Sequence, residues 1–263
     1  MRIIESENDI GFITAAYVKK RINEAGGRIV LGLPTGGTME SFYRHLVEFC
    51  AKGELSFKEV ATFNLDEYIG LRRGDKESYR SYMNSRLFDM VDIEPANIHF
   101  PDVYAEDLEK AGLEYDKKIE SYGGIDIFLG GVGRNGHIAF NEAGTPFDAP
   151  THKVELSEST RKANSRFFNN DINAVPKYAF TMGMGTILKS REIIILASGE
   201  KKSEALYRAV EGPVSPQWPI SALRLHNNSY IVADPKALSQ VSTAGKKRFA
   251  VCSFGGECQG GCK

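Results

Sequence analysis

The sequence predicts an α/β fold: a single, Rossmann-like domain with a doubly wound, mostly parallel sheet and helices on both faces. Two observations lead to this prediction. Strand-like apolar runs alternate with helix-periodic segments along the 263 residues, which is the pattern of strand–helix–strand units. No internal repeat and no linker divides the chain.

The first elements form a strand–helix–strand unit. Arg2–Glu5 is a short strand candidate, and Asn8–Ala25 is predicted as a helix that stops at Gly26-Gly27. Arg28–Leu33 is apolar enough for a buried strand, and it enters a turn at 34–38. A helix with one apolar face from Met39 to Cys50 follows that turn.

Strands and helices continue to alternate after residue 60. Val60–Leu65 is predicted as a strand that ends on Asp66-Glu67-Tyr68, which places carboxylates at the edge of a site. The further predicted elements are helices around Lys76–Met90 and Ala105–Ser121, a helix through Val210, and strands at Asn97–Phe100, Ile125–Leu129, Tyr178–Met182, Glu192–Ala197 and Tyr230–Ala233.

Two segments lack this periodicity. The polar span from Ala143 to Asn173 is interpreted as loop, with a lid near 156–176, because long irregular stretches beside a site are often lids. The Gly- and Cys-rich end, 246–263, is predicted to be a disordered tail after a domain of residues 1–245. Its cysteines match no zinc spacing, so no metal is expected.

Composition narrows the range of functions. A net charge of −1 without a basic block gives no electrostatic reason to expect nucleic acid as a partner. No apolar run approaches the roughly 20 residues that span a bilayer. The first residues lack the apolar core of a signal peptide, so a cytoplasmic location is expected.

The segment Gly130–Glu142, GGVGRNGHIAFNE, is the most informative motif in the chain. It satisfies GxGxxG, but it lacks the acidic residue about 20 positions later and the N-terminal placement of a dinucleotide loop. It carries instead His137 with Glu142 five residues later, and Asn135 beside them. A histidine with a carboxylate is typical of acid–base chemistry.

The turn after the second strand predicts a phosphate site. Thr35, Gly36, Gly37 and Thr38 lead into a helix, whose free backbone N–H groups and dipole favour an anion. The GK[ST] element of a P-loop is absent, and an ordinary strand–helix turn is the alternative interpretation. With Asp66 and Lys202 at the same sheet edge, the residues favour proton transfer on a phosphorylated small molecule.

Four motifs together resemble the glucosamine-6-phosphate deaminases: LGLPTGGT at 31–38, TFNLDEY at 62–68, the segment 130–142, and NSRFF at 164–168. The resemblance runs from about residue 1 to 234. It implies conversion of glucosamine 6-phosphate and water to fructose 6-phosphate and ammonia, in amino sugar catabolism and without a cofactor.

The resemblance also implies roles for individual residues. His137, Glu142 and Asn135 would open the sugar ring, and Asp66 would move the C2 proton toward C1. The phosphate would bind at residues 35–38, with Arg166 from the lid and Lys202. Asn135 departs from the pattern, because many members of the family carry Asp at this position.

The sequence leaves two alternative functions open. A 6-phosphogluconolactonase-like hydrolase would share the fold and the phosphate turn, but it would not need a proton-shuttling Asp66. A non-catalytic sugar-phosphate-sensing module would need a DNA-binding segment, and the first 30 residues show neither a helix-turn-helix pattern nor a basic excess. The sequence leaves a homo-oligomer open.

Overall fold

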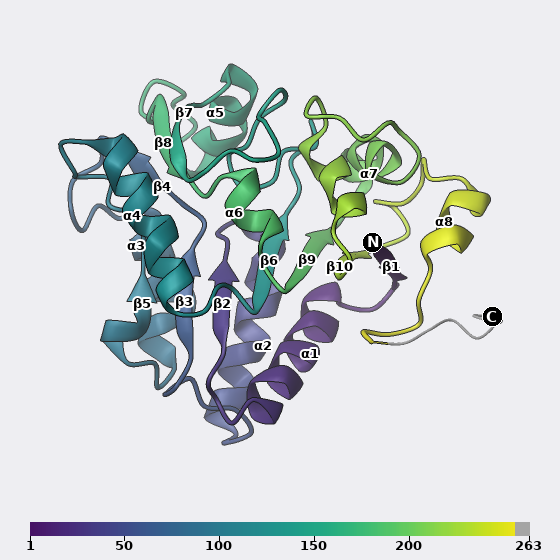
Figure 1. Cartoon of the computed structure of the whole chain (residues 1–263), viewed down its shortest axis with the longest axis horizontal. Coiled ribbons are helices and arrows are strands. Elements are labelled where there is room, and N and C mark those ends of the chain that lie inside the picture. The colour runs from purple at the N-terminus through teal and green to yellow at the C-terminus, as the bar shows by residue number, and fades with distance from the viewer. Residues whose placement is uncertain (256–263) are drawn as a thin grey trace.

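The computed structural model describes residues 1–255, and within them the chain forms a seven-stranded parallel sheet and a three-stranded antiparallel sheet. The order of the main sheet is β1-β10-β9-β6-β2-β3-β5 (Figure 1). Its strands are β1 Arg2–Glu5, β2 Val30–Leu33, β3 Ala61–Asn64, β5 Ile98–His99, β6 Ile127–Gly131, β9 Glu192–Ala197 and β10 Ser229–Ala233. The small sheet contains β4 Asp66–Ile69, β8 Tyr178–Thr181 and β7 His152–Glu155.

Helices connect these strands. The α-helices are α1 Ile10–Glu24, α2 Glu40–Ala51, α3 Tyr79–Arg86, α4 Leu108–Ser121, α5 Glu158–Asn164, α6 Met184–Leu188, α7 Ser203–Val210 and α8 Thr243–Phe249. The 3-10 helices are η1 Gly37–Met39, η2 Phe88–Met90, η3 Pro95–Asn97, η4 Ser165–Phe167, η5 Glu200–Lys202 and η6 Pro219–Leu225.

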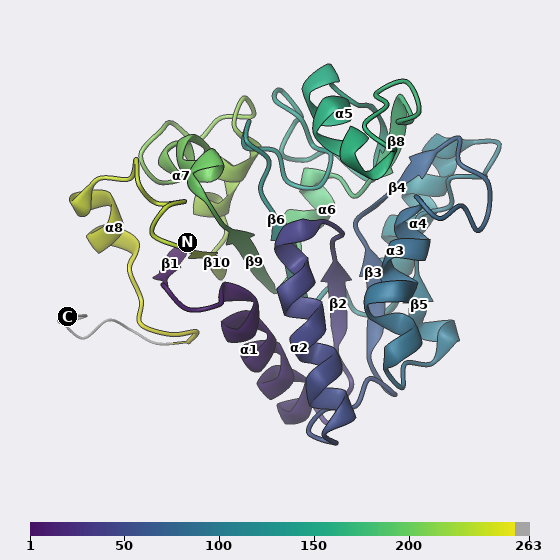
Figure 2. The same ribbon diagram turned by 180° about the vertical axis from the view of Figure 1, so that it is seen from behind.

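The main sheet separates two hydrophobic cores, which confirms the doubly wound fold. Alternate residues of β9 enter different cores, because successive side chains of a strand point to opposite faces. Ile193 and Ile195 pack in one core with residues of α4, α6 and α7. Ile194 and Leu196 pack in the other core with residues of α1, α2 and α3. Figure 1 shows α4 and α6 in front of the sheet, and Figure 2 shows α1 and α2 in front of the opposite face.

The strand order reverses between β2 and β6, and this switch point determines where a ligand can bind. From β2 the chain builds outward through β3 to β5, whereas β6 leads through β9 to β10 on the other side. In open α/β sheets the ligand crevice lies beyond the carboxyl ends of the strands at such a point. The two loops that leave it are 34–38 after β2 and 132–142 after β6.

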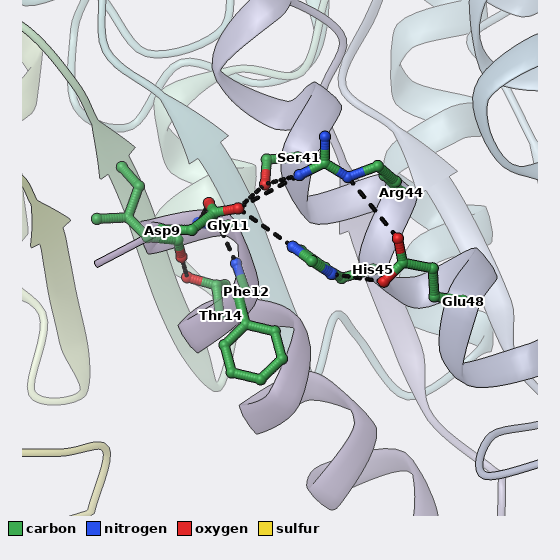
Figure 3. Close-up of polar contacts among 9 residues, drawn as sticks. Asp9, Gly11, Phe12, Thr14, Ser41, Arg44, His45 and Glu48 are labelled. Carbon is green, nitrogen blue, oxygen red and sulfur yellow. Dashed lines mark hydrogen bonds and ion pairs between the residues drawn. The ribbon is translucent and has the colours of Figure 1, made fainter. Parts of the chain in front are cut away.

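Asp9 joins the first two helices. Its carboxylate caps α1 by accepting hydrogen bonds from the backbone N–H groups of Gly11 at 2.9 Å and Phe12 at 3.4 Å. The same carboxylate accepts a hydrogen bond from Ser41 and lies 3.1 Å from His45 Nε2 on α2 (Figure 3). Gly11 permits this close approach, since a Cβ there would lie 2.6 Å from the Phe42 nitrogen.

Replacing Asp9 with Ala is therefore expected to lower the free energy of unfolding by about 1–2 kcal/mol, mainly because the α1 cap is lost. Urea unfolding measures this change. Glu24→Ala is the matched control, because Glu24 lies at the other end of α1 and, among residues 1–255, pairs only with Lys20, at 3.7 Å on the surface. An equal loss in the two variants would mean that Asp9 contributes nothing as a cap.

The small sheet differs from the sequence-based prediction. Asp66-Glu67-Tyr68 does not end the third strand: the chain continues into β4, which pairs with β8 in antiparallel register from Asp66 opposite Thr181. The polar span 143–173, expected to be irregular, contains β7 and α5. The strands β4 and β7 and the helix α5 are too short for their apolar residues to show a clear period in the sequence. The pairing of β4 with β8 also joins segments that lie far apart in the chain.

The C-terminal part also differs from the expected tail. Residue 246 lies inside α8, and the chain then returns to the edge strand, where the Val251 N–H donates to the Ile3 carbonyl at 2.9 Å. The Phe254 ring stacks on Tyr17 with 3.9 Å between ring centroids. Cys258 and Cys262 lie outside the described residues. Up to residue 255, no helix is both long and apolar enough to cross a membrane.

Candidate active site

The predicted site residues gather beyond the carboxyl ends of the main strands. The loops after β2 and β6 meet there, and the small sheet with α5 lies above them in Figures 1 and 2. The fold therefore brings the turn at 35–38 and the segment 130–142 to one edge, as the sequence predicts.

Asn135, His137 and Glu142 form a connected polar group, which we call the relay. The Asn135 amide Nδ2 donates to Glu142 Oε2 at 2.5 Å. His137 Nδ1 lies 3.7 Å from the same Oε2, an ion-pair distance if the ring is protonated. Both the histidine and the glutamate are about one-fifth exposed, at 21% and 17% of their side-chain surface. The predicted histidine–carboxylate pair is thus brought together, with Asn135 bound to the carboxylate.

Two glycines and one strained alanine shape the loop that carries the relay. A Cβ on Gly133 would lie 2.3 Å from His137 Cε1, so only glycine leaves room for the ring. Gly136 has a φ of 79°, which glycine adopts without strain. Ala139 has a φ of 52°, a left-handed conformation that is unfavourable for a residue with a Cβ. Backbone strain of this kind concentrates at functional sites, where the surroundings enforce it.

Glu142 stays ionised because of its donors. Burial raises the pKa of its carboxyl, but the neighbouring His137 and the hydrogen bonds from Thr160 and Asn135 outweigh burial and lower the pKa to about 2. A carboxylate with several donors is stabilised in its charged form. At neutral pH Glu142 is therefore an anion that can balance a proton on His137.

The turn after β2 leads directly into η1 and α2. Gly36, with a φ of 114°, precedes η1, and Gly37 is exposed. Two tyrosine hydroxyls hold the carbonyls of the turn: Tyr43 donates to Pro34 O, and Tyr82 donates to Gly36 O at 3.1 Å. The helix dipole and the N–H groups at this end favour an anion. Thr35 and Thr38 are half-buried in the same turn.

Cationic side chains lie beside the turn and beside the neighbouring loop after β6. Arg166, from η4, places an Nη atom 3.9 Å from where a Cβ of Gly37 would lie. Lys202, at the end of η5, donates from Nζ to the Val132 carbonyl at 2.6 Å. Burial lowers the pKa of Lys202 to about 8, and the charges of Arg134 and Arg166 act in the same direction. Three positive groups that repel one another in this way would be stabilised by a bound phosphate.

Asp66 is a buried carboxylate without a partner. It is 7% exposed, and its side chain has no hydrogen bond or ion pair among residues 1–255. Burial, and secondly the charge of Glu67, raise its pKa to about 8. A carboxyl with a raised pKa at the sheet edge where ligands bind is a candidate general base.

Glu67 has a different role from its neighbour. Its carboxylate accepts hydrogen bonds from the backbone N–H groups of Tyr68, Tyr79 and Arg80 at 2.8–2.9 Å. It therefore caps α3. Successive residues of β4 point to opposite faces, which leaves Asp66 facing away from this cap.

Several residues near the site carry no signal in the sequence that marks their contacts. Ser157 and Thr160 contact Glu142, Tyr82 contacts the turn, and Arg134 lies close enough to lower the pKa of Lys202. Only Arg134 had a local signal, as the basic residue within the glycine-rich motif. The other contacts depend on tertiary packing.

Comparison with known proteins agrees with the resemblance that the sequence motifs indicate. The family model of the glucosamine-6-phosphate isomerases/6-phosphogluconolactonase matches residues 9–232. A glucosamine-6-phosphate deaminase of Vibrio cholerae is 46% identical over 255 residues, which cover 95% of this chain and 96% of that protein. One of Vibrio campbellii is 47% identical over 245 residues, with 92% of each chain covered.

Solved structures show the same relationship. A structure described as a monomeric glucosamine-6-phosphate deaminase superposes with a TM-score of 0.88 at 43% identity, covering 91% of this chain and 100% of that one. A 6-phosphogluconolactonase from Thermotoga maritima gives a TM-score of 0.68 at 19% identity, covering 89% and 98%. The second likeness shows a shared fold only.

Proposed function

Because the chain belongs to the glucosamine-6-phosphate isomerase/6-phosphogluconolactonase family, we propose that it is a glucosamine-6-phosphate deaminase. It converts glucosamine 6-phosphate and water to fructose 6-phosphate and ammonia, a reaction of amino sugar catabolism. The deaminases of Vibrio at 46–47% identity and the solved deaminase at 43% support this activity.

We assign the binding step to the turn at 35–38. Backbone N–H groups of Gly36, Gly37 and Thr38 would bind the phosphate, with Arg166 and Lys202 closing on it. Charge-assisted contacts to phosphate are stronger than neutral ones. They would fix the sugar so that its reacting carbons lie between the relay and Asp66.

The chemistry divides between the relay and the base. His137 would transfer a proton between the ring oxygen and the C1 hydroxyl, while the ionised Glu142 balances the charge on the imidazole. Asp66 would then remove the C2 proton of the open chain while the C1 aldehyde oxygen gains a proton, which gives the enolamine. Asp66 would return its proton to C1 as the nitrogen loses a proton. The resulting C2 imine takes up water and releases ammonia, which leaves the ketone of fructose 6-phosphate.

The position of Asp66 is the main observation that supports these assignments. An unpaired, buried Asp66 with a raised pKa lies at the same sheet edge as the relay and the cationic turn. A lactonase needs an activated water but no base that shuttles a proton between two carbons. The site therefore favours the deaminase over the 6-phosphogluconolactonase-like alternative.

An assay of three substrates tests the proposal. We expect the protein to release ammonia and fructose 6-phosphate in equal amounts from glucosamine 6-phosphate. Unphosphorylated glucosamine should react with kcat/KM lower by roughly 10²-fold or more, because the charged contacts to phosphate are lost. Rapid hydrolysis of 6-phosphogluconolactone without ammonia release from the amino sugar would support the lactonase instead.

The proposed activity indicates where the protein works, and its assembly state can be measured directly. We place the enzyme in the cytoplasm, because a charged sugar phosphate does not cross a bilayer unaided. The sequence leaves a homo-oligomer open, and the solved relative is described as monomeric. Sedimentation of the purified protein distinguishes a monomer of 29.1 kDa from an oligomer.

A further inference from the structure

The carboxylate of Glu142 is held from two sides. Its Oε2 faces the relay, with Asn135 Nδ2 at 2.5 Å and His137 Nδ1 at 3.7 Å. Its Oε1 accepts a hydrogen bond from the Thr160 hydroxyl at 2.6 Å. The Ser157 hydroxyl lies 3.1 Å from the same Oε1. The two oxygens therefore have separate sets of partners.

The second set of partners comes from the expected lid and not from the glycine-rich loop. Ser157 caps α5, where its side chain accepts a hydrogen bond from the Thr160 N–H at 3.2 Å. Thr160 lies in the first turn of α5 and is only 6% exposed, although the neighbouring residues of this polar segment are mostly exposed. A buried threonine hydroxyl directed at a carboxylate has one proton to donate, and here Glu142 receives it.

The same segment also reaches the other two parts of the site. Asn164, at the end of α5, donates to the Tyr68 hydroxyl at 2.9 Å, and Tyr68 lies two residues after Asp66 on β4. Arg166 follows in η4 and lies against Gly37. Residues 157–166 thus connect Glu142, the strand of the base and the phosphate turn.

We propose that Thr160 is a positioning residue for ring opening: its hydroxyl fixes Oε1 of Glu142 so that Oε2 faces His137. The inference rests on the proposed deaminase function and assigns a role to a residue that does not itself touch the sugar.

Thr160→Val tests the role, since valine keeps the shape and removes only the donor. We expect kcat for glucosamine 6-phosphate to fall by roughly 10-fold or more, the change that corresponds to a lost hydrogen bond to a charged group. KM and the inhibition constant of inorganic phosphate should stay within about twofold, because Arg166 keeps its place. Thr160→Ser should restore most of kcat.

Two controls separate positioning from damage to the fold. Thr14→Val removes a buried helical threonine hydroxyl that donates to Ile10 O at 2.8 Å on α1, away from the site, and should leave kcat unchanged. If Thr160→Val does not fold, Thr160→Ala gives the same comparison with a smaller side chain.

Three results would overturn the inference. They are a kcat within about twofold in the folded variant, a loss of phosphate inhibition as large as the loss of kcat, and no rescue by serine. Failure of the proposed function is distinguishable, because it would show as absent ammonia release from the unaltered protein.

Discussion

Replacing Asp66 with Asn is expected to lower kcat for ammonia release by about 10²–10⁴-fold, the contribution of a positioned general base. Asparagine keeps the shape of the side chain but cannot accept the C2 proton. KM should change little, because the phosphate contacts at residues 35–38 lie in the connection after β2, whereas Asp66 lies on β4. A variant with more than half of the original rate would show that another group is the base.

The same substitution should stabilise the fold, which distinguishes an inactive enzyme from an unfolded one. Asp66 has a folded-state pKa of about 8. In the unfolded chain an aspartate titrates near ~4. Between these values the folded state binds one more proton, so the unaltered protein loses stability as pH rises from ~4 to ~8.

The asparagine side chain does not titrate, so the variant should lack this loss. The stability gain of Asp66→Asn is therefore absent below pH ~4 and complete above pH ~8. Urea unfolding at several pH values measures it. A variant that is less stable than the parent at pH 8 would show that the carboxylate is not destabilised by burial.

Removing the cations of the phosphate site is the second large perturbation. Arg166→Ala and Lys202→Ala should each raise KM for glucosamine 6-phosphate by roughly 10- to 100-fold, because each loses a charge-assisted contact to phosphate. The effect on unphosphorylated glucosamine should be small, so both variants discriminate less between the two sugars.

Lys201→Ala is the matched control, since Lys201 is the exposed neighbour of Lys202 in η5. It should leave KM within about twofold, as surface substitutions usually do. If Lys201→Ala and Lys202→Ala had equal effects, general electrostatic attraction would explain phosphate binding, and the specific contact at residue 202 would have to be abandoned.

The sequence predicts most of the main sheet because its strands carry their own signal. Glu192–Ala197 is buried at every position, and its apolar run needs two covered faces. The relay was also predictable, since Asn135, His137 and Glu142 lie within eight residues of one glycine-rich loop. Local patterns of this kind need no knowledge of tertiary contacts.

The small sheet and the contact between Thr160 and Glu142 could not be predicted from local patterns. β4 is four residues long and pairs with β8, more than 100 residues later, so no local periodicity marks it. The sequence pattern places Asp66 at the site edge but does not reveal the strand that holds it. Thr160 reaches Glu142 from a position that no motif marks, and only the folded chain shows that contact.

The most direct test of Asp66 as the base follows deuterium into the product. C2-deuterated glucosamine 6-phosphate is converted in D₂O, and the fructose 6-phosphate is analysed by NMR. We expect one deuterium at C1, in a single stereochemical position, because one carboxylate delivers it to one face of the enolamine. Asp66→Asn should form this product about 10²–10⁴-fold more slowly. Deuterium spread equally over both C1 positions would contradict a positioned base at Asp66.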